Sequence, residues 1–129
     1  GTPGYLADVT KAFEEAFRLL RPEGHVVVGD VPASSGYGML YQLATRIKSW
    51  DDPDLKKIAP PDPYPIEFAS LAHWRTTEEL SISLTRAGFC DLKYAQTLTR
   101  HPRYTNDTVE EPTPGFDRGG YVAIRGRKK

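Results

Sequence analysis

The chain has 129 residues, with 17 basic and 17 acidic side chains and a formal net charge of zero. That length allows one domain, and an apolar fraction of 39% is ordinary for a globular protein. The balanced charge gives no electrostatic footprint for nucleic acid or an anionic membrane, and no apolar run is long enough to cross a bilayer. A single cysteine, Cys90, excludes an internal disulfide and, with an N-terminus unlike a signal peptide, favours the cytoplasm.

The first regular elements are expected to be a helix and a strand joined by a turn. Asp8 suits an N-cap, and apolar residues then recur in steps of three and four from Val9 to Leu20, which predicts an amphipathic helix. Pro22 and Gly24 end it. The β-branched run 25–28 does not alternate with polar residues, which predicts a strand covered on both faces, as in a parallel sheet.

The middle of the chain is expected to be less regular. Residues 31–38 are rich in turn formers, and a second helix is predicted over about 39–50, with Ser35 as a candidate cap. Five of the eleven prolines lie in residues 51–65, where they predict stiff, extended backbone instead of helix. We expect this segment to be ordered, because four nearby side chains could anchor it: Ile58, Tyr64, Ile66 and Phe68.

The last third of the chain predicts one helix and two strands. Thr76 and Glu79 have the spacing of a capping box, and Gly88 sits where a left-handed C-cap belongs. Residues 92–99 and 121–124 are strand-like, and a polar loop separates them. The order helix, strand, helix, helix, strand, strand predicts an α/β fold.

Three of these motifs, in this order, resemble class I S-adenosylmethionine-dependent methyltransferases. The sequence FEEAFRLLRPEGHVVVGD is similar to that family's helix, Leu-Arg-Pro-Gly-Gly turn and fifth strand, although Glu23 stands where glycine is commoner. The sequence TTEELSISLTRAGFCDLKYAQTL is similar to its last helix and sixth strand. The ending GGYVAIRGRKK is similar to the final strand, which in that fold runs antiparallel between strands five and six. Within that family, the sequence most resembles the small-molecule methyltransferases of the ubiquinone-biosynthesis type.

The resemblance implies that residues 1–129 form the C-terminal half of a Rossmann-like methyltransferase domain, with strands five, seven and six, flanking helices and a lid-like insertion over 31–75. In this family a Gly-rich loop and an acidic residue hold S-adenosylmethionine, and both precede the helix that begins here near Asp8. The cofactor-binding residues are therefore expected mainly upstream of Gly1. The resemblance therefore does not lead us to expect that this chain alone binds S-adenosylmethionine.

Four residues are candidates for binding a substrate. Asp30 ends a strand at the edge where ligands sit in open α/β sheets, but it could equally cap the next turn. Tyr37 belongs to the lid implied by the resemblance. Trp74 could stack on a substrate with His73 as a base, although a core tryptophan beside a solvated histidine is the simpler interpretation. Lid aromatics such as Tyr37 and Trp74 favour an apolar or aromatic substrate, and so do Tyr41 and Phe68.

Other motifs carry weaker signals. Gly36-Tyr-Gly38 follows a strand and precedes a helix, so it could hold a phosphate, but it lacks the third glycine of a nucleotide loop. The three histidines lack metal-ligand spacing, and no metal site is expected. Cys90 is interpreted as a small buried apolar residue.

The sequence thus favours methyl transfer to a small-molecule acceptor, with this chain supplying the substrate side. The alternatives are a catalytically incompetent fragment that serves as an interaction or folding partner, and an unrelated α/β module that binds phosphate at residues 36–38. The apolar edge of strand 25–28 is expected to be covered by an N-terminal half or by a symmetry mate, which favours a homo-oligomer. Neither nucleic acid nor a membrane is an expected partner.

Overall fold

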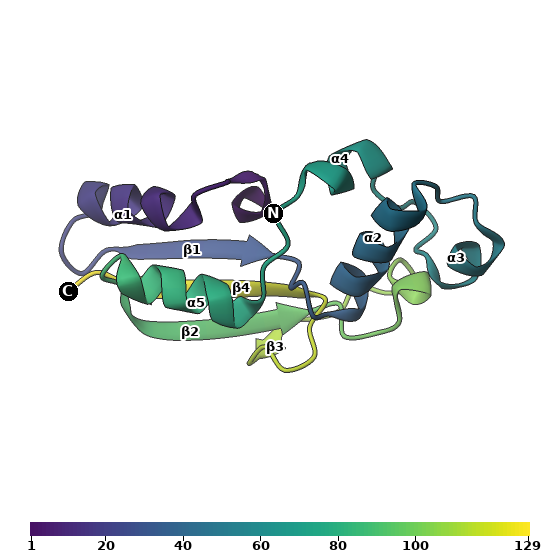
Figure 1. The fold of residues 1–129 in the computed structure, drawn as a ribbon. Coiled ribbons are helices and arrows are strands. Elements are labelled where there is room, and N and C mark those ends of the chain that lie inside the picture. The colour runs from purple at the N-terminus through teal and green to yellow at the C-terminus, as the bar shows by residue number, and fades with distance from the viewer.

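A four-stranded sheet forms the centre of the computed structural model, which describes every residue from Gly1 to Lys129 (Figure 1). The strands are β1 (His25–Asp30), β2 (Cys90–Thr97), β3 (Thr113–Pro114) and β4 (Tyr121–Arg127), and they lie in the order β1-β4-β2-β3. Every neighbouring pair is antiparallel. The last strand, β4, therefore lies between β1 and β2, as the sequence led us to expect.

The helices divide into two groups. Helices α1 (Val9–Leu19) and α5 (Thr77–Arg86) lie along the sheet, whereas α2 (Gly36–Ile47), α3 (Pro53–Ile58) and α4 (Ile66–Leu71) gather beyond the end to which β1 points (Figure 1). Two short 3-10 helices complete the chain, η1 (Thr2–Tyr5) and η2 (Pro102–Tyr104). The N-terminus lies near the tip of β1, beside the second group of helices (Figure 1).

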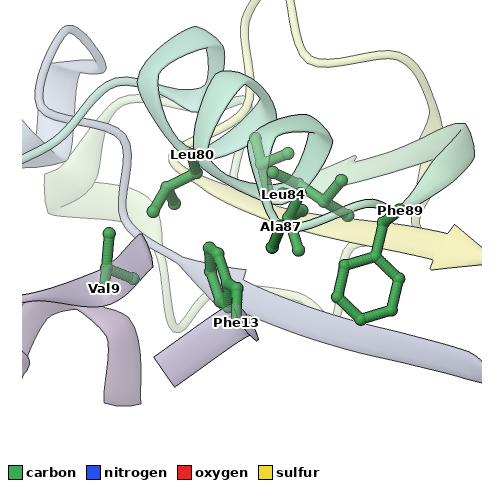
Figure 2. Packing of buried hydrophobic residues seen from close by; sticks show 8 residues of the cluster. Val9, Phe13, Leu80, Leu84, Ala87 and Phe89 are labelled. Carbon is green, nitrogen blue, oxygen red and sulfur yellow. The ribbon is translucent and has the colours of Figure 1, made fainter. Parts of the chain in front are cut away.

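The main core fills the space between α1, α5 and one face of the sheet. Figure 2 shows Val9 and Phe13 of α1 opposite Leu80 and Leu84 of α5. Phe89, which follows α5, is 2% exposed, and its ring meets the ring of Phe17 edge-on at 5.2 Å. Full burial of such a side chain stabilises a fold by about 1.5–3 kcal/mol.

The predicted helix boundaries around this core are confirmed. The Asp8 carboxylate accepts a hydrogen bond from the backbone N–H of Lys11 at 2.9 Å. Thr76 and Glu79 form the reciprocal capping box, with bonds of 3.1 and 2.7 Å. Gly88 has φ +107°, a left-handed conformation that a glycine adopts without strain. These features depend on hydrogen bonds and backbone conformation within one helical turn. They could therefore be predicted from the local sequence.

The prediction that β1 is covered on both faces is wrong in this structure. Val26 and Val28 pack against the core, whereas Val27 on the other face is 65% exposed. The strand is also at the edge of the sheet, because β4 is its one strand neighbour. The run of valines in β1 is therefore covered on one face of the strand and exposed on the other.

The second helix begins earlier than predicted. Ser35 is the N-cap, as expected, and its hydroxyl accepts from the N–H of Gly38 at 3.0 Å. This bond closes the first turn over residues 36–38, which we had expected to be a loop. The helix then ends at Ile47, before Trp50, because Lys48 adopts a left-handed conformation with φ 62°.

The proline-rich segment is ordered, but it contains a helix where extended backbone was predicted. Pro53 occupies the first turn of α3, where the missing N–H costs nothing, and the Asp52 carboxylate caps the helix. The buried anchor is Leu55, which is 2% exposed. Of the four predicted anchors, Ile66 is half-buried, whereas Ile58, Tyr64 and Phe68 are 39%, 64% and 53% exposed. The prolines therefore do not prevent a short helix from forming in this segment, and one of them lies in its first turn.

Candidate functional site

A cavity of about 510 Å³ lies at the carboxyl end of β1, between the sheet and the second group of helices. All four predicted substrate residues line it, namely Asp30, Tyr37, His73 and Trp74. They reach it from three different places in the chain: the end of β1, the first turn of α2, and the segment between α4 and α5. The fold thus brings together residues that the sequence indicated separately.

Asp30 is half-buried, and its carboxylate is held by backbone groups. It accepts a hydrogen bond from the N–H of Val31 at 2.9 Å, and a Cβ on Gly4 would lie 3.4 Å from its Oδ2. Burial raises the pKa of the Asp30 carboxyl above its usual 3.8, against the opposing effects of the Val31 N–H, the N-terminal amine and Arg75. The two roles considered for Asp30, capping the next turn and binding a substrate, are therefore compatible. The same carboxylate accepts from the N–H of Val31 and borders the cavity.

Tyr37 is 6% exposed, although it belongs to the first turn of a helix near the surface. Its ring lies against the backbone of Gly120, where a Cβ would come within 2.3 Å of Tyr37 Cδ2. The hydroxyl is buried and has no hydrogen-bond partner. Burial raises the pKa of the phenol, and the charge of Glu110 acts in the same direction, so this hydroxyl stays protonated at neutral pH.

An aromatic cluster forms another wall of the cavity. Trp74 stacks on Tyr41 with a centroid distance of 6.2 Å, and Tyr41 meets Trp50 edge-on at 5.3 Å. These rings also hold the proline-rich segment in place through both backbone groups of Tyr64. Tyr41 Oη accepts a hydrogen bond from the Tyr64 N–H at 3.0 Å, and Trp50 Nε1 donates one to the Tyr64 carbonyl at 2.9 Å. Trp74 is thus half-buried against another cavity residue, not in the main core.

His73 is exposed at the cavity rim. Its backbone N–H donates to the carbonyl of Gly4 at 2.6 Å. The next residue, Arg75, donates to the carbonyls of Pro3 at 2.8 Å and Leu6 at 2.6 Å. The segment that carries His73 and Trp74 is therefore tied to η1, which forms the adjacent wall.

Sequence reasoning missed several cavity residues. Tyr5, Asp62, Thr105 and Tyr121 line it as well, from elements far apart in the chain. Thr105 carries the second buried hydroxyl without a partner. A polar loop residue of this kind gives no sequence signal, because only the tertiary fold brings it to the cavity. Of the predicted lid aromatics, Tyr41 lines the cavity, whereas Phe68 is not among its wall residues.

The other sequence motifs do not form a second site of this kind. Gly36 and Gly38 lie within α2, and Gly38 allows close packing, since a Cβ there would lie 2.1 Å from the carbonyl oxygen of Pro32. Cys90 is half-buried, with its thiol 3.4 Å from the carbonyl oxygen of Arg127. No cluster of three or more histidine, cysteine or acidic side chains has the geometry to hold a metal ion. None of the helices combines the length and apolar character that a bilayer span requires.

Comparison with solved structures gives a clear match. The chain is similar to the crystal structure of a SAM-dependent methyltransferase from Thermotoga maritima, described as a possible histamine N-methyltransferase, with a TM-score of 0.77 and 30% sequence identity. The chain has a methyltransferase fold. The similarity covers 99% of this chain and 52% of that protein, so the chain spans about half the length of its structural neighbour. No protein-family model matches the sequence, and no curated protein sequence matches it significantly.

Proposed function

We propose that this chain is the acceptor-binding part of an S-adenosylmethionine-dependent methyltransferase that acts on a small molecule. The observation that carries the proposal is the match to a SAM-dependent methyltransferase along 99% of the chain. A cavity of about 510 Å³ at the carboxyl end of β1 has the size and position expected of a small-molecule site. Residues 1–129 would then be the C-terminal half of a class I methyltransferase domain, with 31–75 as its lid.

The residues of this chain do not by themselves fit the cofactor. A nucleotide needs a backbone cradle, and Gly36 and Gly38, the candidates for one, belong to α2, where Gly38 packs against Pro32. When bound, S-adenosylmethionine supplies an electrophilic methyl group, and its binding residues are proposed to lie mainly upstream of Gly1. The part left to this chain is to hold the acceptor, orient it and exclude water.

The side chains that line the cavity are suited to holding an acceptor, orienting it and excluding water. The Trp74 and Tyr41 rings give apolar walls that shield a bound molecule from water, while Asp30 offers a fixed carboxylate to orient it. His73, at the rim, is in a position to accept a proton from an acceptor that must lose one. Methyl transfer depends mostly on such positioning, so a preformed cavity contributes directly to the rate.

The open edge of β1 needs a partner in this proposal. The strand pairs with β4 on one side, and Val27 is 65% exposed. Such an edge invites another strand. We propose that an N-terminal half of the domain or a second copy of the chain covers it, in a cytoplasmic and homo-oligomeric enzyme.

The test is calorimetry of the full-length protein with S-adenosylhomocysteine, followed by incubation with methyl-labelled S-adenosylmethionine and a mixture of small acceptors that includes histamine. The proposal predicts submillimolar binding and a labelled methyl group on at least one acceptor. The alternative, a catalytically incompetent interaction partner, predicts neither. Absence of both signals from a folded protein would contradict the proposed function.

A further inference from the structure

One cavity residue, Leu98, has a strained backbone. Its φ is 55°, in the left-handed region that glycine adopts freely and that a leucine side chain disfavours. Three other residues that are not glycine have a positive φ, namely Glu23, Lys48 and Asp91. All three are charged, and none of them lines the cavity, whereas Leu98 does. The strain at Leu98 is therefore the one case that falls on an apolar residue and at the cavity.

The other three positions have local explanations that do not apply to Leu98. Lys48 ends α2 as a left-handed C-cap. Glu23 and Asp91 both form ion pairs with Arg127. Leu98 ends no helix and carries no charge, and it directly follows β2. Because strained residues cluster at ligand-binding sites, this one indicates that the leucine side chain has a function at the cavity.

Hydrogen bonds on both sides of Leu98 hold its backbone in this conformation. The Thr97 hydroxyl donates to the backbone carbonyl of Glu110 at 2.9 Å. The N–H of Thr99 lies 2.9 and 3.0 Å from the two carboxylate oxygens of Glu110, and the Thr99 hydroxyl donates to the same carboxylate. The carbonyl of Leu98 itself accepts from the N–H of Gly120 at 2.9 Å. Contacts from two distant segments therefore impose the strained conformation.

The Leu98 side chain contributes to neither hydrophobic cluster of the chain. Leu98 is half-buried, but it packs against neither the main core nor the smaller cluster around Leu55. Its backbone lies beside Tyr37, since a Cβ on Gly120 would meet the Tyr37 ring at 2.3 Å and the Leu98 carbonyl oxygen at 2.8 Å. No other leucine, isoleucine or methionine lines the cavity. Leu98 is thus the one large aliphatic residue in a wall made mostly of aromatic and polar residues.

We propose that Leu98 determines which acceptors fit the cavity. Its side chain limits the space beside Tyr37 and so favours an acceptor with one aromatic ring over an acceptor with two fused rings. Glu110 is a positioning residue, because it acts on the loop that carries Leu98 and not on the acceptor. The inference rests on the proposed function, since it takes the cavity as the acceptor site, but the selectivity can be measured without methyl transfer.

Two uncharged probes, phenol and 2-naphthol, differ by one fused ring and test this limit. The quantity to measure, by calorimetry with the full-length protein, is the ratio of their dissociation constants. Leu98→Ala and Leu98→Gly both remove the side chain and are expected to shift this ratio about tenfold in favour of 2-naphthol. Leu98→Met keeps the volume of the side chain and should keep the ratio of the parent.

Melting temperatures separate the role of the side chain from that of the backbone. Glycine adopts a φ of 55° without strain and alanine does not, so Leu98→Gly should melt a few degrees above Leu98→Ala, although the two bind alike. Lys48→Gly and Lys48→Ala are the matched controls, because Lys48 has φ 62° and lies outside the cavity. They should show the same difference in melting temperature and leave the binding ratio unchanged.

Glu110→Ala tests how Leu98 is held in place. Loss of the carboxylate frees the backbone of Thr99, so the ratio is expected to shift about threefold in favour of 2-naphthol. In a Leu98→Gly background the same substitution should cause no further shift, because no side chain is left to position. Glu110→Gln keeps one oxygen that can accept from Thr99 and should lie between Glu110→Ala and the parent.

The results that would overturn this inference differ from those that would overturn the proposed function. An unchanged ratio in Leu98→Ala and Leu98→Gly, including one that results from an equal loss of affinity for both probes, would contradict it. Absence of binding of either probe to the parent at millimolar concentration would do the same. A shift toward 2-naphthol that is absent in Leu98→Met and Lys48→Gly supports it. Failure to bind S-adenosylhomocysteine, with this selectivity intact, would contradict only the proposed function.

Discussion

The ring of Tyr37 lies directly over the backbone of Gly120, so closely that a Cβ on Gly120 would come within 2.3 Å of Tyr37 Cδ2. Gly120 is itself buried, and its N–H donates to the carbonyl of Leu98 at 2.9 Å. This contact joins α2 to the start of β4. It also fixes one wall of the cavity, since Tyr37 and Leu98 both line it.

Substitution of Gly120 by alanine tests this contact. The new methyl group would also meet the Leu98 carbonyl oxygen at 2.8 Å, so both the ring and the backbone must move. We expect the free energy of unfolding to fall by about 1–3 kcal/mol, as for other overpacked sites. Urea unfolding measures it. Gly36→Ala is the control, since nothing lies within 4 Å of a Cβ there, and it should leave stability unchanged or raise it by up to about 1 kcal/mol.

Asp30→Asn should change the dependence of stability on pH. Burial raises the pKa of Asp30 above 3.8, so the folded state holds this proton more tightly than the unfolded chain does. Its contribution to stability is present below pH 3.8 and is lost as pH rises through the raised pKa. We therefore expect the asparagine variant to gain stability relative to the parent as pH rises from 3 to 7. Urea unfolding across this range measures the difference, and a constant difference would show that burial does not shift this carboxyl.

Glu23→Gly should relieve backbone strain in the turn before β1. Glu23 has φ 67°, a left-handed conformation that costs a non-glycine residue about 1–2 kcal/mol. The glycine variant loses the exposed ion pair with Arg127, which offsets part of the gain. We expect the glycine chain to be more stable than a Glu23→Gln chain, which keeps the strain and also loses the charge. Thermal unfolding compares the two, and a more stable glutamine variant would contradict the strain argument.

Tyr41→Phe should loosen the proline-rich segment without unfolding the domain. The Tyr41 hydroxyl accepts from the N–H of Tyr64, while Trp50 holds the carbonyl of the same residue. Loss of one such bond costs about 1 kcal/mol, so the Tyr64 amide should exchange with deuterium about fivefold faster. Amide exchange monitored by mass spectrometry measures it, with Tyr104→Phe as the control. Unchanged exchange at Tyr64 would show that Trp50 alone holds the segment.

Gln96→Leu should destabilise the loop that leads to Gly120. Gln96 is 2% exposed, and its amide donates to Pro114 and Asp117 while accepting from the N–H groups of Arg118 and Gly119. Leucine leaves these backbone groups unpaired, so we expect a loss of about 2–4 kcal/mol in the free energy of unfolding. A loss below that of Gly120→Ala would show that water replaces the amide.

Features set by local chemistry could be predicted from the sequence. The Asp8 cap and the Thr76–Glu79 capping box depend on hydrogen bonds within one turn, and Gly88 depends on its own backbone freedom. The sequence does not predict α3, because several prolines in one short segment indicate extended backbone. Asp52 followed by Pro53, which caps and begins the helix, is the weaker of the two patterns.

Features set by long-range contact could be predicted only in part. Asp30 lies at a strand end, a general place for ligands, and Trp74 is a conspicuous residue type, so both could be proposed as cavity residues. Thr105 comes from a polar loop, and its unpaired hydroxyl follows from packing that no local pattern records. The exposure of Val27 likewise depends on which elements cover the sheet.

The most direct test is a methyl-transfer assay on the full-length protein with deuterium-labelled S-adenosylmethionine and a mixture of small aromatic acceptors, analysed by mass spectrometry. We expect a labelled methyl group on at least one acceptor, a loss of about tenfold in the rate of its transfer with Asp30→Asn at subsaturating acceptor, and an unchanged rate with Tyr104→Phe. Equal rates for Asp30→Asn and the parent, or no transfer by a protein that binds both ligands, would contradict the claim that this cavity holds the methyl acceptor.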